Sequence, residues 1–212
     1  MTKSEAIQLL AKRYTAKGMV DFGTPEDTLI ATLLSARTRD EQVIKAYPGL
    51  RKAFPALKDF AKATPQAIEK EISTIGLYRA KARAIHGLAK LLIERHAGQV
   101  PKTMEELVEL PGVGRKTASC VLGYAFKLPA IAVDTHVYRI AHRLGWVKGN
   151  TPEKVEEELK RQVPKALWRE VNRVFIPFGR EICKPGTPLC WKCPLASICA
   201  YKPKTPPPKM VV

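Results

Sequence analysis

The sequence predicts an all-α protein. Helix-start signals recur along the chain, and apolar residues follow them at helical spacing. The only strand-like stretch is 130–133, Ala-Ile-Ala-Val, which is too short to build a sheet. From the number of start signals we expect about ten helices.

The first predicted helix begins at residues 2–5, Thr-Lys-Ser-Glu. This pattern is a capping box, in which the first and last side chains each bond the other's backbone N–H group. Ile7, Leu10 and Tyr14 then lie on one helical face, and Gly18 supplies a stop.

Later helices are predicted to begin with a threonine. Thr24-Pro25, Thr64-Pro65 and Thr151-Pro152 each place a cap residue before a first-turn proline. Residues 103–106, Thr-Met-Glu-Glu, form a second capping box. Between 118 and 125 the apolar residues keep helical spacing without a break, so we expect one continuous helix there.

The composition is strongly basic. Among 212 residues, 36 Lys and Arg oppose 20 Asp and Glu, for a net charge of +16. Each cation near a phosphate releases counterions, so this excess favours a nucleic-acid partner over a merely basic surface. No apolar run approaches the ~18 residues of a membrane span, and the first residues begin no apolar leader. We therefore expect no signal peptide, no membrane partner and a cytoplasmic, nucleoid-associated protein.

Four of the five cysteines lie close together near the C-terminus. Cys183, Cys190, Cys193 and Cys199 follow the spacing C-x6-C-x2-C-x5-C, which indicates a soft metal centre. By spacing alone, a zinc site and an iron–sulfur cluster both remain open. Cys120 stands apart and is expected to be a small core residue.

A glycine-containing turn separates two predicted helices at 110–114, Leu-Pro-Gly-Val-Gly. Gly112 and Gly114 permit backbone conformations closed to other residues, and they leave N–H groups able to face an anion. An ordinary helix–helix turn is the alternative. The fuller sequence 110–118 in so basic a chain favours a grip on a nucleic-acid backbone.

Two residues after this turn are candidates for chemistry. Lys116 falls in the first turn of the next helix, where the helix dipole, together with partial burial, would favour a neutral, nucleophilic amine. A phosphate-contacting lysine is the alternative, and the residues alone favour it. Asp134 follows the apolar stretch 130–133 and precedes Thr135. Such a carboxylate needs a partner or a task, and a helix N-cap is compatible with either.

Three separated motifs, in this order, resemble the endonuclease III family, DNA glycosylases of the helix-hairpin-helix superfamily with a Gly/Pro-Asp signature. They are residues 110–118, residues 133–136 and the four C-terminal cysteines. The likeness extends over nearly the whole chain and includes 33–36 and 75–78 with Lys81.

The resemblance implies a bifunctional DNA glycosylase and apurinic/apyrimidinic (AP) lyase of base excision repair. Such an enzyme removes oxidised pyrimidines from duplex DNA. Lys116 would attack C1′ of the flipped nucleotide, and Asp134 would stabilise the positive charge that develops on the sugar. The resulting Schiff base lets the 3′ phosphate leave by β-elimination. The four clustered cysteines would hold a [4Fe–4S] cluster.

The resemblance also assigns contacts to double-stranded DNA. The expected contacts are Arg37, Leu77, Gly112, Val113, Gly114, Arg115 and Lys192. Lys192 lies in the cysteine loop and could meet a phosphate, with a solvated surface charge as the alternative. Leu77 matches an intercalating side chain, although a core leucine beside a turn is the alternative. Arg37 stands where the family often has a glutamine that fills the space left by the flipped base. We hypothesise that Arg37 alters the preference for the opposite base or slows turnover.

The family's architecture implies two helical domains that flank a DNA-binding cleft, with Lys116 and Asp134 on opposite sides. One domain would span 18–128 and contain the hairpin. The other would combine 1–17 with 129–212 and carry the cluster loop, ending in a disordered basic tail at about 203–212. We expect a monomer.

Two other functions remain open. A monofunctional mismatch or damage glycosylase would share the fold, but its relatives lack a lysine at the position of Lys116. A non-catalytic DNA-binding module would use the hairpin and a structural metal, and Asp134 in its expected motif argues against it.

Overall fold

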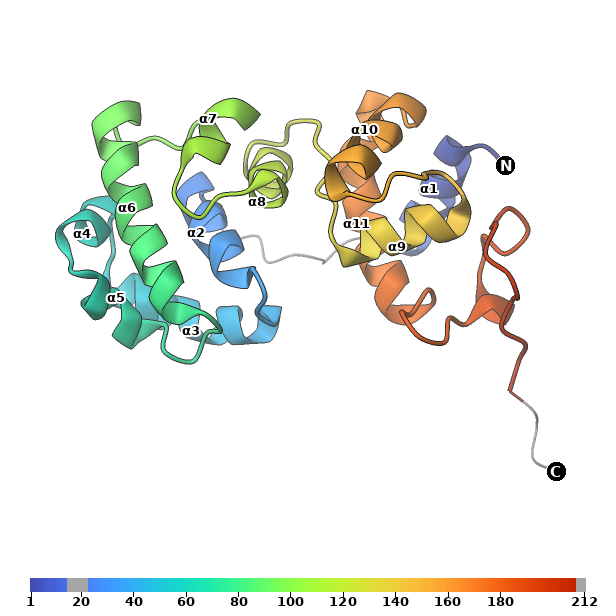
Figure 1. Cartoon of the computed structure of the whole chain (residues 1–212), viewed down its shortest axis with the longest axis horizontal. Helices are drawn as coiled ribbons and strands as arrows, with labels where there is room; N and C mark the ends of the chain where they lie inside the picture. Colours follow the sequence, from blue (N-terminus) through green and yellow to red (C-terminus); the bar gives the residue numbers. More distant parts are fainter. Residues whose placement is uncertain (15–22, 209–212) are drawn as a thin grey trace. The chain divides into compact units, whose positions relative to one another are not determined.

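The structure is a computed structural model that describes residues 1–14 and 23–208, and within them it is helical and contains no strand (Figure 1). The all-α prediction is confirmed, with eleven α-helices in the described residues where about ten were expected. They are α1 (Lys3–Arg13), α2 (Pro25–Ser35), α3 (Asp40–Ala53), α4 (Leu57–Lys62), α5 (Pro65–Glu71), α6 (Tyr78–His96), α7 (Met104–Glu109), α8 (Arg115–Cys120), α9 (Thr135–Leu144), α10 (Pro152–Gln162) and α11 (Trp168–Glu181).

The predicted threonine starts are confirmed. A threonine side chain accepts a hydrogen bond from a backbone N–H at the start of α1, α2, α5, α7 and α10. The capping box at Thr2 is complete. At Thr103 the hydroxyl also donates to the Glu106 carboxylate. The predicted stop at Gly18 lies outside the described residues, as do the last residues of the predicted tail, 209–212.

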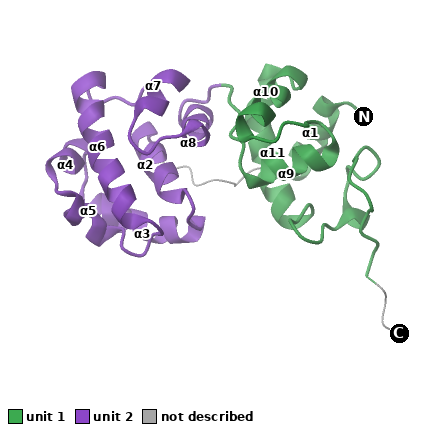
Figure 2. Cartoon of the chain, viewed as in Figure 1, with its two compact units in different colours: residues 1–19, 129–212 green, residues 20–128 purple. Residues whose placement is uncertain are grey.

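The chain divides into two compact units (Figure 2). Unit 1 comprises Met1–Met19 and Pro129–Val212, and unit 2 is Val20–Leu128. The division into domains at 18–128, and at 1–17 with 129–212, remains a prediction.

Unit 2 is built around α2. Every residue of this helix from Thr28 to Leu34 is buried, so α2 has no solvent face along most of its length. It packs against α3, α6 and α8, while α6 also packs on α4 and α5. The loop that contains Arg37 follows the C-terminal end of this buried helix, and Arg37 itself is exposed at the surface of the unit.

Unit 1 has a core formed by α1, α9 and α11. Phe175 and Phe178 of α11 are buried in it, and the ring centroids of Phe175 and Trp146 are 5.7 Å apart. The strand-like stretch 130–133 is held by a side chain: Asn172 of α11 bonds both the N–H and the carbonyl of Ala132, at 2.9 and 2.6 Å. The backbone N–H and carbonyl of Ala132 thus have hydrogen-bond partners although no neighbouring strand is present in the described residues.

The expectation of one continuous α-helix over 118–125 is wrong in its geometry. The chain is α-helical to Cys120 and then forms a π-helix, Val121–Ala125. The N–H of Phe126 reaches back five residues to the carbonyl of Val121, at 3.3 Å. Apolar spacing does not distinguish these two geometries over so short a stretch, because both keep a buried face.

Candidate active site

The turn between α7 and α8 forms a compact hairpin of two short helices. The N–H of Val113 donates to the carbonyl of Leu110 at 3.0 Å, which closes the turn. Gly112 has a φ of +76°, and a Cβ there would lie 2.7 Å from Cβ of Ala84 and 3.1 Å from Cδ1 of Leu33. Both its backbone conformation and its close packing therefore require glycine.

The second glycine of the hairpin differs from the first. Gly114 is the N-cap of α8 with φ −95° and ψ 175°, an extended conformation open to any residue. The prediction that both glycines adopt conformations closed to other residues is correct for Gly112 and wrong for Gly114. A Cβ at Gly114 would meet nothing within 4 Å, so this glycine leaves open space at the start of α8.

The other predicted DNA contacts of the hairpin differ in exposure. Val113 is 5% exposed, and its N–H is used inside the turn. Arg115, by contrast, is exposed at the surface. Any contact that Val113 makes with another molecule must come from the backbone of the turn.

Lys116 is the second residue of α8 and is exposed. The next four residues, Thr117 to Cys120, are buried, so Lys116 lies at the edge where the helix leaves the surface. Partial burial, one of the two effects expected to favour its neutral form, is therefore absent. Its place in the first helical turn is as predicted. Cys120 is 1% exposed, as expected for a core residue.

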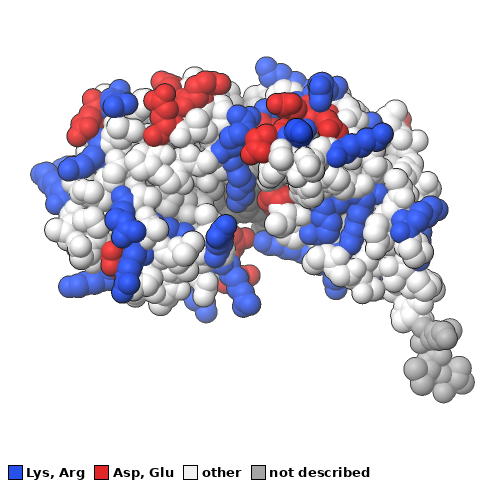
Figure 3. Space-filling view, in the orientation of Figure 1, with Lys and Arg blue, Asp and Glu red and all other residues white. Residues whose placement is uncertain are grey.

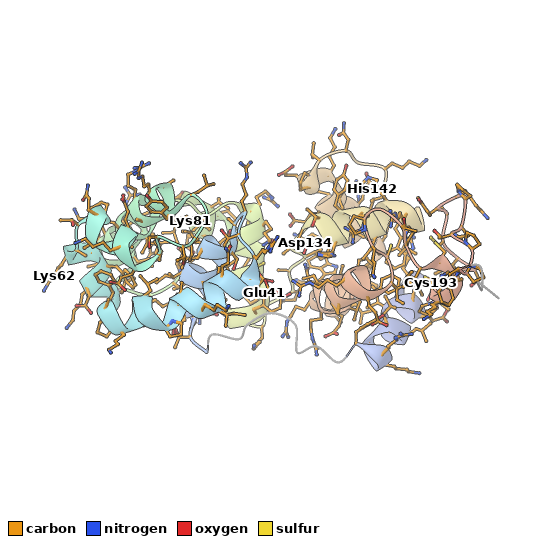
Figure 4. The ribbon with its side chains drawn as sticks, turned by 90° about the horizontal axis from the view of Figure 1, so that it is seen from below. Glu41, Lys62, Lys81, Asp134, His142 and Cys193 are labelled. Atoms are coloured by element: carbon orange, nitrogen blue, oxygen red, sulfur yellow. The ribbon has the colours of Figure 1, made fainter. Side chains whose placement is uncertain are left out.

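Asp134 is the N-cap of α9 (Figure 4). Its Oδ1 accepts hydrogen bonds from the N–H groups of His136 and Val137, at 2.9 and 2.8 Å. The N-cap prediction is confirmed. Both bonds end on one oxygen, and within the described ranges no protein donor is recorded on Oδ2. This partly exposed carboxylate is thus fixed in direction through one oxygen and keeps the other for a further contact.

Arg37 and Leu77 share an unusual backbone conformation. Both lie in the left-handed region, with φ of 54° and 60°. Non-glycine residues there cost roughly 1–2 kcal/mol, and such strain is typical of functional positions. Leu77 is 59% exposed, which contradicts the alternative that it is a core leucine.

Sequence reasoning named Lys81 without giving it a role, and the structure places it inside unit 2 (Figure 4). It is 6% exposed and shares a helical face of α6 with Ile85, Leu88 and Leu92. A lysine on an otherwise apolar stripe is the signal that could have identified it.

The four clustered cysteines line one pocket. The other residues around it are Arg143, Ile182, Pro188 and Tyr201. Burial raises the pKa of the Cys193 thiol to about 11, and the three other thiols of the cluster add to the shift (Figure 4). Four cysteine thiols thus lie around one pocket, and a metal centre there remains a prediction.

Among the residues that the structure describes, no group of three or more His, Cys, Asp or Glu side chains is placed to hold one ion. A tetrahedral zinc site would need every sulfur at about 2.3 Å from one atom. The choice between zinc and an iron–sulfur cluster therefore rests on the family and not on the geometry of this pocket.

Arg143 ties the cysteine loop to α9. Its guanidinium donates to the carbonyls of Lys184 and Pro185, both at 2.6 Å, and lies 3.5 Å from Sγ of Cys183. It also stacks over the ring of Tyr201, with 4.6 Å to the centroid. The backbone conformation of the cysteine loop is thus stabilised by one guanidinium that bonds two of its carbonyl groups.

Basic side chains are exposed on this loop. Lys192 is exposed, and its Nζ lies 4.5 Å from the ring centroid of Trp191, which is 40% exposed. Lys184 and Arg180 are exposed nearby in the sequence. In unit 2, acidic side chains gather at the top edge, over α7, and the lower part of the face in view carries mostly Lys and Arg (Figure 3). The net charge is thus unevenly spread over this unit.

Comparison with known proteins agrees with these features. Residues 30–165 match the HhH-GPD superfamily of base excision DNA repair proteins. The endonuclease III of Thermotoga maritima is 49% identical over 177 residues, which cover 84% of this chain and 83% of that protein. The chain belongs to the endonuclease III family of the HhH-GPD superfamily. Its hairpin is therefore the family's helix-hairpin-helix motif, with Gly112 at the tight turn.

Solved structures support the endonuclease III fold. A trapped endonuclease III–DNA covalent intermediate superimposes with a TM-score of 0.86 at 38% identity, covering 94% of this chain and 96% of that one. A thermostable thymine-DNA glycosylase superimposes with a TM-score of 0.81 at 26% identity, covering 93% of this chain and 94% of that one.

No helix in the described parts of the chain is long and apolar enough to cross a membrane.

Proposed function

We propose that this member of the endonuclease III family is a bifunctional DNA glycosylase and AP lyase that excises oxidised pyrimidines from double-stranded DNA. The observation that carries the proposal is the exposed amine of Lys116, placed directly after the hairpin in a chain 49% identical to an endonuclease III. A related endonuclease III has been trapped covalently on DNA, which supports a nucleophilic route.

In this proposal Lys116 supplies the nucleophile. Its deprotonated Nζ attacks C1′ of the flipped nucleotide, and the glycosidic bond breaks as the base leaves and takes up a proton. Opening of the sugar ring gives a Schiff base between Nζ and C1′. Loss of a proton from C2′ then expels the 3′ phosphate, and water releases the lysine. Exposure of Lys116 lets it meet a sugar that has left the helical stack.

Asp134 would stabilise charge and transfer protons. Its Oδ1 is held by two backbone N–H groups, so the carboxylate has a fixed direction. A preorientated anion stabilises an oxocarbenium-like sugar without reorganising during the reaction. The same carboxylate can take the proton that the attacking amine must lose.

The hairpin and the two strained loops would bind the duplex. Gly114 leaves open space where a phosphate can approach the start of α8, and Arg115 and Lys192 add exposed cations. Leu77 and Arg37 would enter the base stack beside the flipped nucleotide. Val113 would contribute only through the backbone of the turn, since its side chain is buried.

Cys183, Cys190, Cys193 and Cys199 would hold a [4Fe–4S] cluster. The support is the pocket that all four line and the membership of the chain in the endonuclease III family. A bound cluster would supply a rigid cross-link among four thiolates and no group to the reaction itself. Arg143 would hold the loop that presents Lys192 to phosphates.

Product analysis on a duplex with one thymine glycol tests the function. The proposal predicts a nicked strand without alkali treatment. An alkali-sensitive but uncut strand would instead identify a monofunctional glycosylase. Binding without base release would identify a non-catalytic DNA-binding protein.

A further inference from the structure

Lys81 has no place in the chemistry proposed above. It lies in the first turn of α6, and its ammonium donates to the carbonyl of Leu34 and to Oγ1 of Thr38, each at 2.7 Å. In the described residues no ion pair joins Lys81 to a carboxylate. Burial lowers its pKa to about 8, as expected for an ammonium that has lost solvent without gaining a counterion.

Such a lysine is a poor choice for stability alone. A buried cation without a counterion is costly, and the start of α6 adds an unfavourable helix dipole. An apolar side chain of similar length would fill the same space at lower cost. The reason for a lysine at this position is therefore to be sought in the groups that its ammonium binds.

Both side-chain partners lie beside Arg37, Leu34 near the end of α2 and Thr38 in the loop that follows. Leu34 and Thr38 flank Arg37 on either side, and the ammonium of Lys81 binds both. The main-chain N–H of Lys81 donates to the carbonyl of Leu77 at 3.1 Å. This is the ordinary first hydrogen bond of α6, whose N-cap is Leu77. The helix therefore holds the Lys81 side chain in a fixed relation to Leu77, while the ammonium binds beside Arg37.

The loops also touch each other directly. A Cβ at Gly76 would lie 3.4 Å from the carbonyl oxygen of Arg37 and 3.4 Å from Oγ1 of Thr38. Both loops carry a positive φ at the residue whose side chain is exposed. Strain of this kind persists only where the surroundings fix the backbone. The Lys81 ammonium bonds the chain on either side of Arg37, and α6, which carries Lys81, begins directly after Leu77.

We propose that Lys81 is a positioning residue that locks the loops of Arg37 and Leu77 into one preformed wedge for insertion into the base stack of duplex DNA. The proposal rests on the proposed function, since the wedge serves base flipping before excision. If the two loops are already ordered before DNA binds, the entropic cost of ordering them is not added to the free energy of base flipping. Lys81 itself does not touch the substrate, because it is buried within unit 2.

The test compares Lys81→Met and Thr38→Val with Thr38→Ser as the matched control. Each of the first two variants removes one side of the contact, and Thr38→Ser keeps the hydroxyl. Single-turnover excision of thymine glycol should fall about tenfold in Lys81→Met and in Thr38→Val. The double variant should fall little further, because both substitutions remove one shared interaction. Thr38→Ser should stay within about twofold of the parent.

A second readout separates positioning from general loss of structure. Cleavage of a duplex with a preformed abasic site needs Lys116 but no extrusion of a base, so it should fall at most about twofold in the same variants. Fluorescence of 2-aminopurine opposite the lesion should show slower base opening. Parent-like excision in both variants, or an equal fall of excision and abasic-site cleavage, would overturn the proposal. Failure of the proposed function is distinguishable, since the parent itself would then either release no base or release it without cutting the strand.

Discussion

The wedge of unit 2 and the cysteine loop of unit 1 are held in different ways. In the wedge, Lys81, Thr38 and Gly76 fix two strained loops through protein contacts alone. The cysteine loop has little regular structure beyond a short 3-10 turn at Cys190–Lys192, and Arg143 holds it through bonds to its backbone. In the proposed function, one DNA contact is thus preformed by a network of protein hydrogen bonds and the other would depend on a bound cluster, so different substitutions should disrupt them.

The largest expected effect is on the cysteine loop. Cys193→Ala should abolish the visible absorbance of an iron–sulfur cluster and lower the melting temperature by at least about 10 °C. Cys120→Ala, a buried cysteine outside the pocket, is the control and should keep the absorbance. Absorbance and iron content measured on both variants decide the matter. Full iron content in Cys193→Ala would remove this thiol from the ligand set.

The two hairpin glycines give the next effect. Gly112→Ala should destabilise the protein by about 2–3 kcal/mol, because it combines a positive φ with a 2.7 Å contact to Ala84. Gly114→Ala should change the free energy of unfolding by less than about 0.5 kcal/mol but weaken binding of duplex DNA. Urea unfolding measures the stability of each variant, and titration with duplex DNA measures its affinity. Equal destabilisation by both would show that Gly114 has a structural role after all.

The sequence could predict the parts of the site that depend on local chemistry. Threonine caps, the place of Lys116 in its helix and Asp134 as an N-cap all follow from short-range hydrogen bonding, and the structure agrees. Lys81 could not be assigned a role in this way. Its partners are 43 and 47 residues away in the chain, so only the fold brings them together.

Similar reasons explain the other differences from prediction. The extended conformation of Gly114 depends on how the hairpin closes, and glycine tolerates either outcome. Exposure of Lys116 depends on where α8 meets its neighbours, which spacing along one helix does not reveal. The π-helix after Cys120 has the same apolar pattern as an α-helix over five residues.

Leu77 provides a smaller test of the wedge. Leu77→Gly should raise the free energy of unfolding by about 0.5–1 kcal/mol, since glycine relieves the left-handed strain. The same change should slow excision of thymine glycol, because the inserting side chain is gone. Thermal unfolding and single-turnover kinetics on one sample provide both readouts. A less stable variant with normal excision would assign Leu77 to the fold instead.

The smallest effect is expected for Arg37. Arg37→Gln should leave stability unchanged within about 0.5 kcal/mol, since the side chain is exposed. The relative excision rates opposite the four bases should change by at least about fivefold, because arginine donates differently from glutamine to an orphaned base. Rates that are unchanged opposite all four bases would end the idea that Arg37 sets this preference.

Borohydride trapping on a thymine-glycol duplex tests the central claim most directly, with Lys116→Gln compared with the parent and with Lys90→Gln, an exposed lysine of unit 2 outside the hairpin. We expect a covalent protein–DNA adduct in the parent and in Lys90→Gln, and none in Lys116→Gln. An adduct that persists in Lys116→Gln would place the Schiff base on another amine. Base release without an adduct in any of the three proteins would contradict the lyase mechanism.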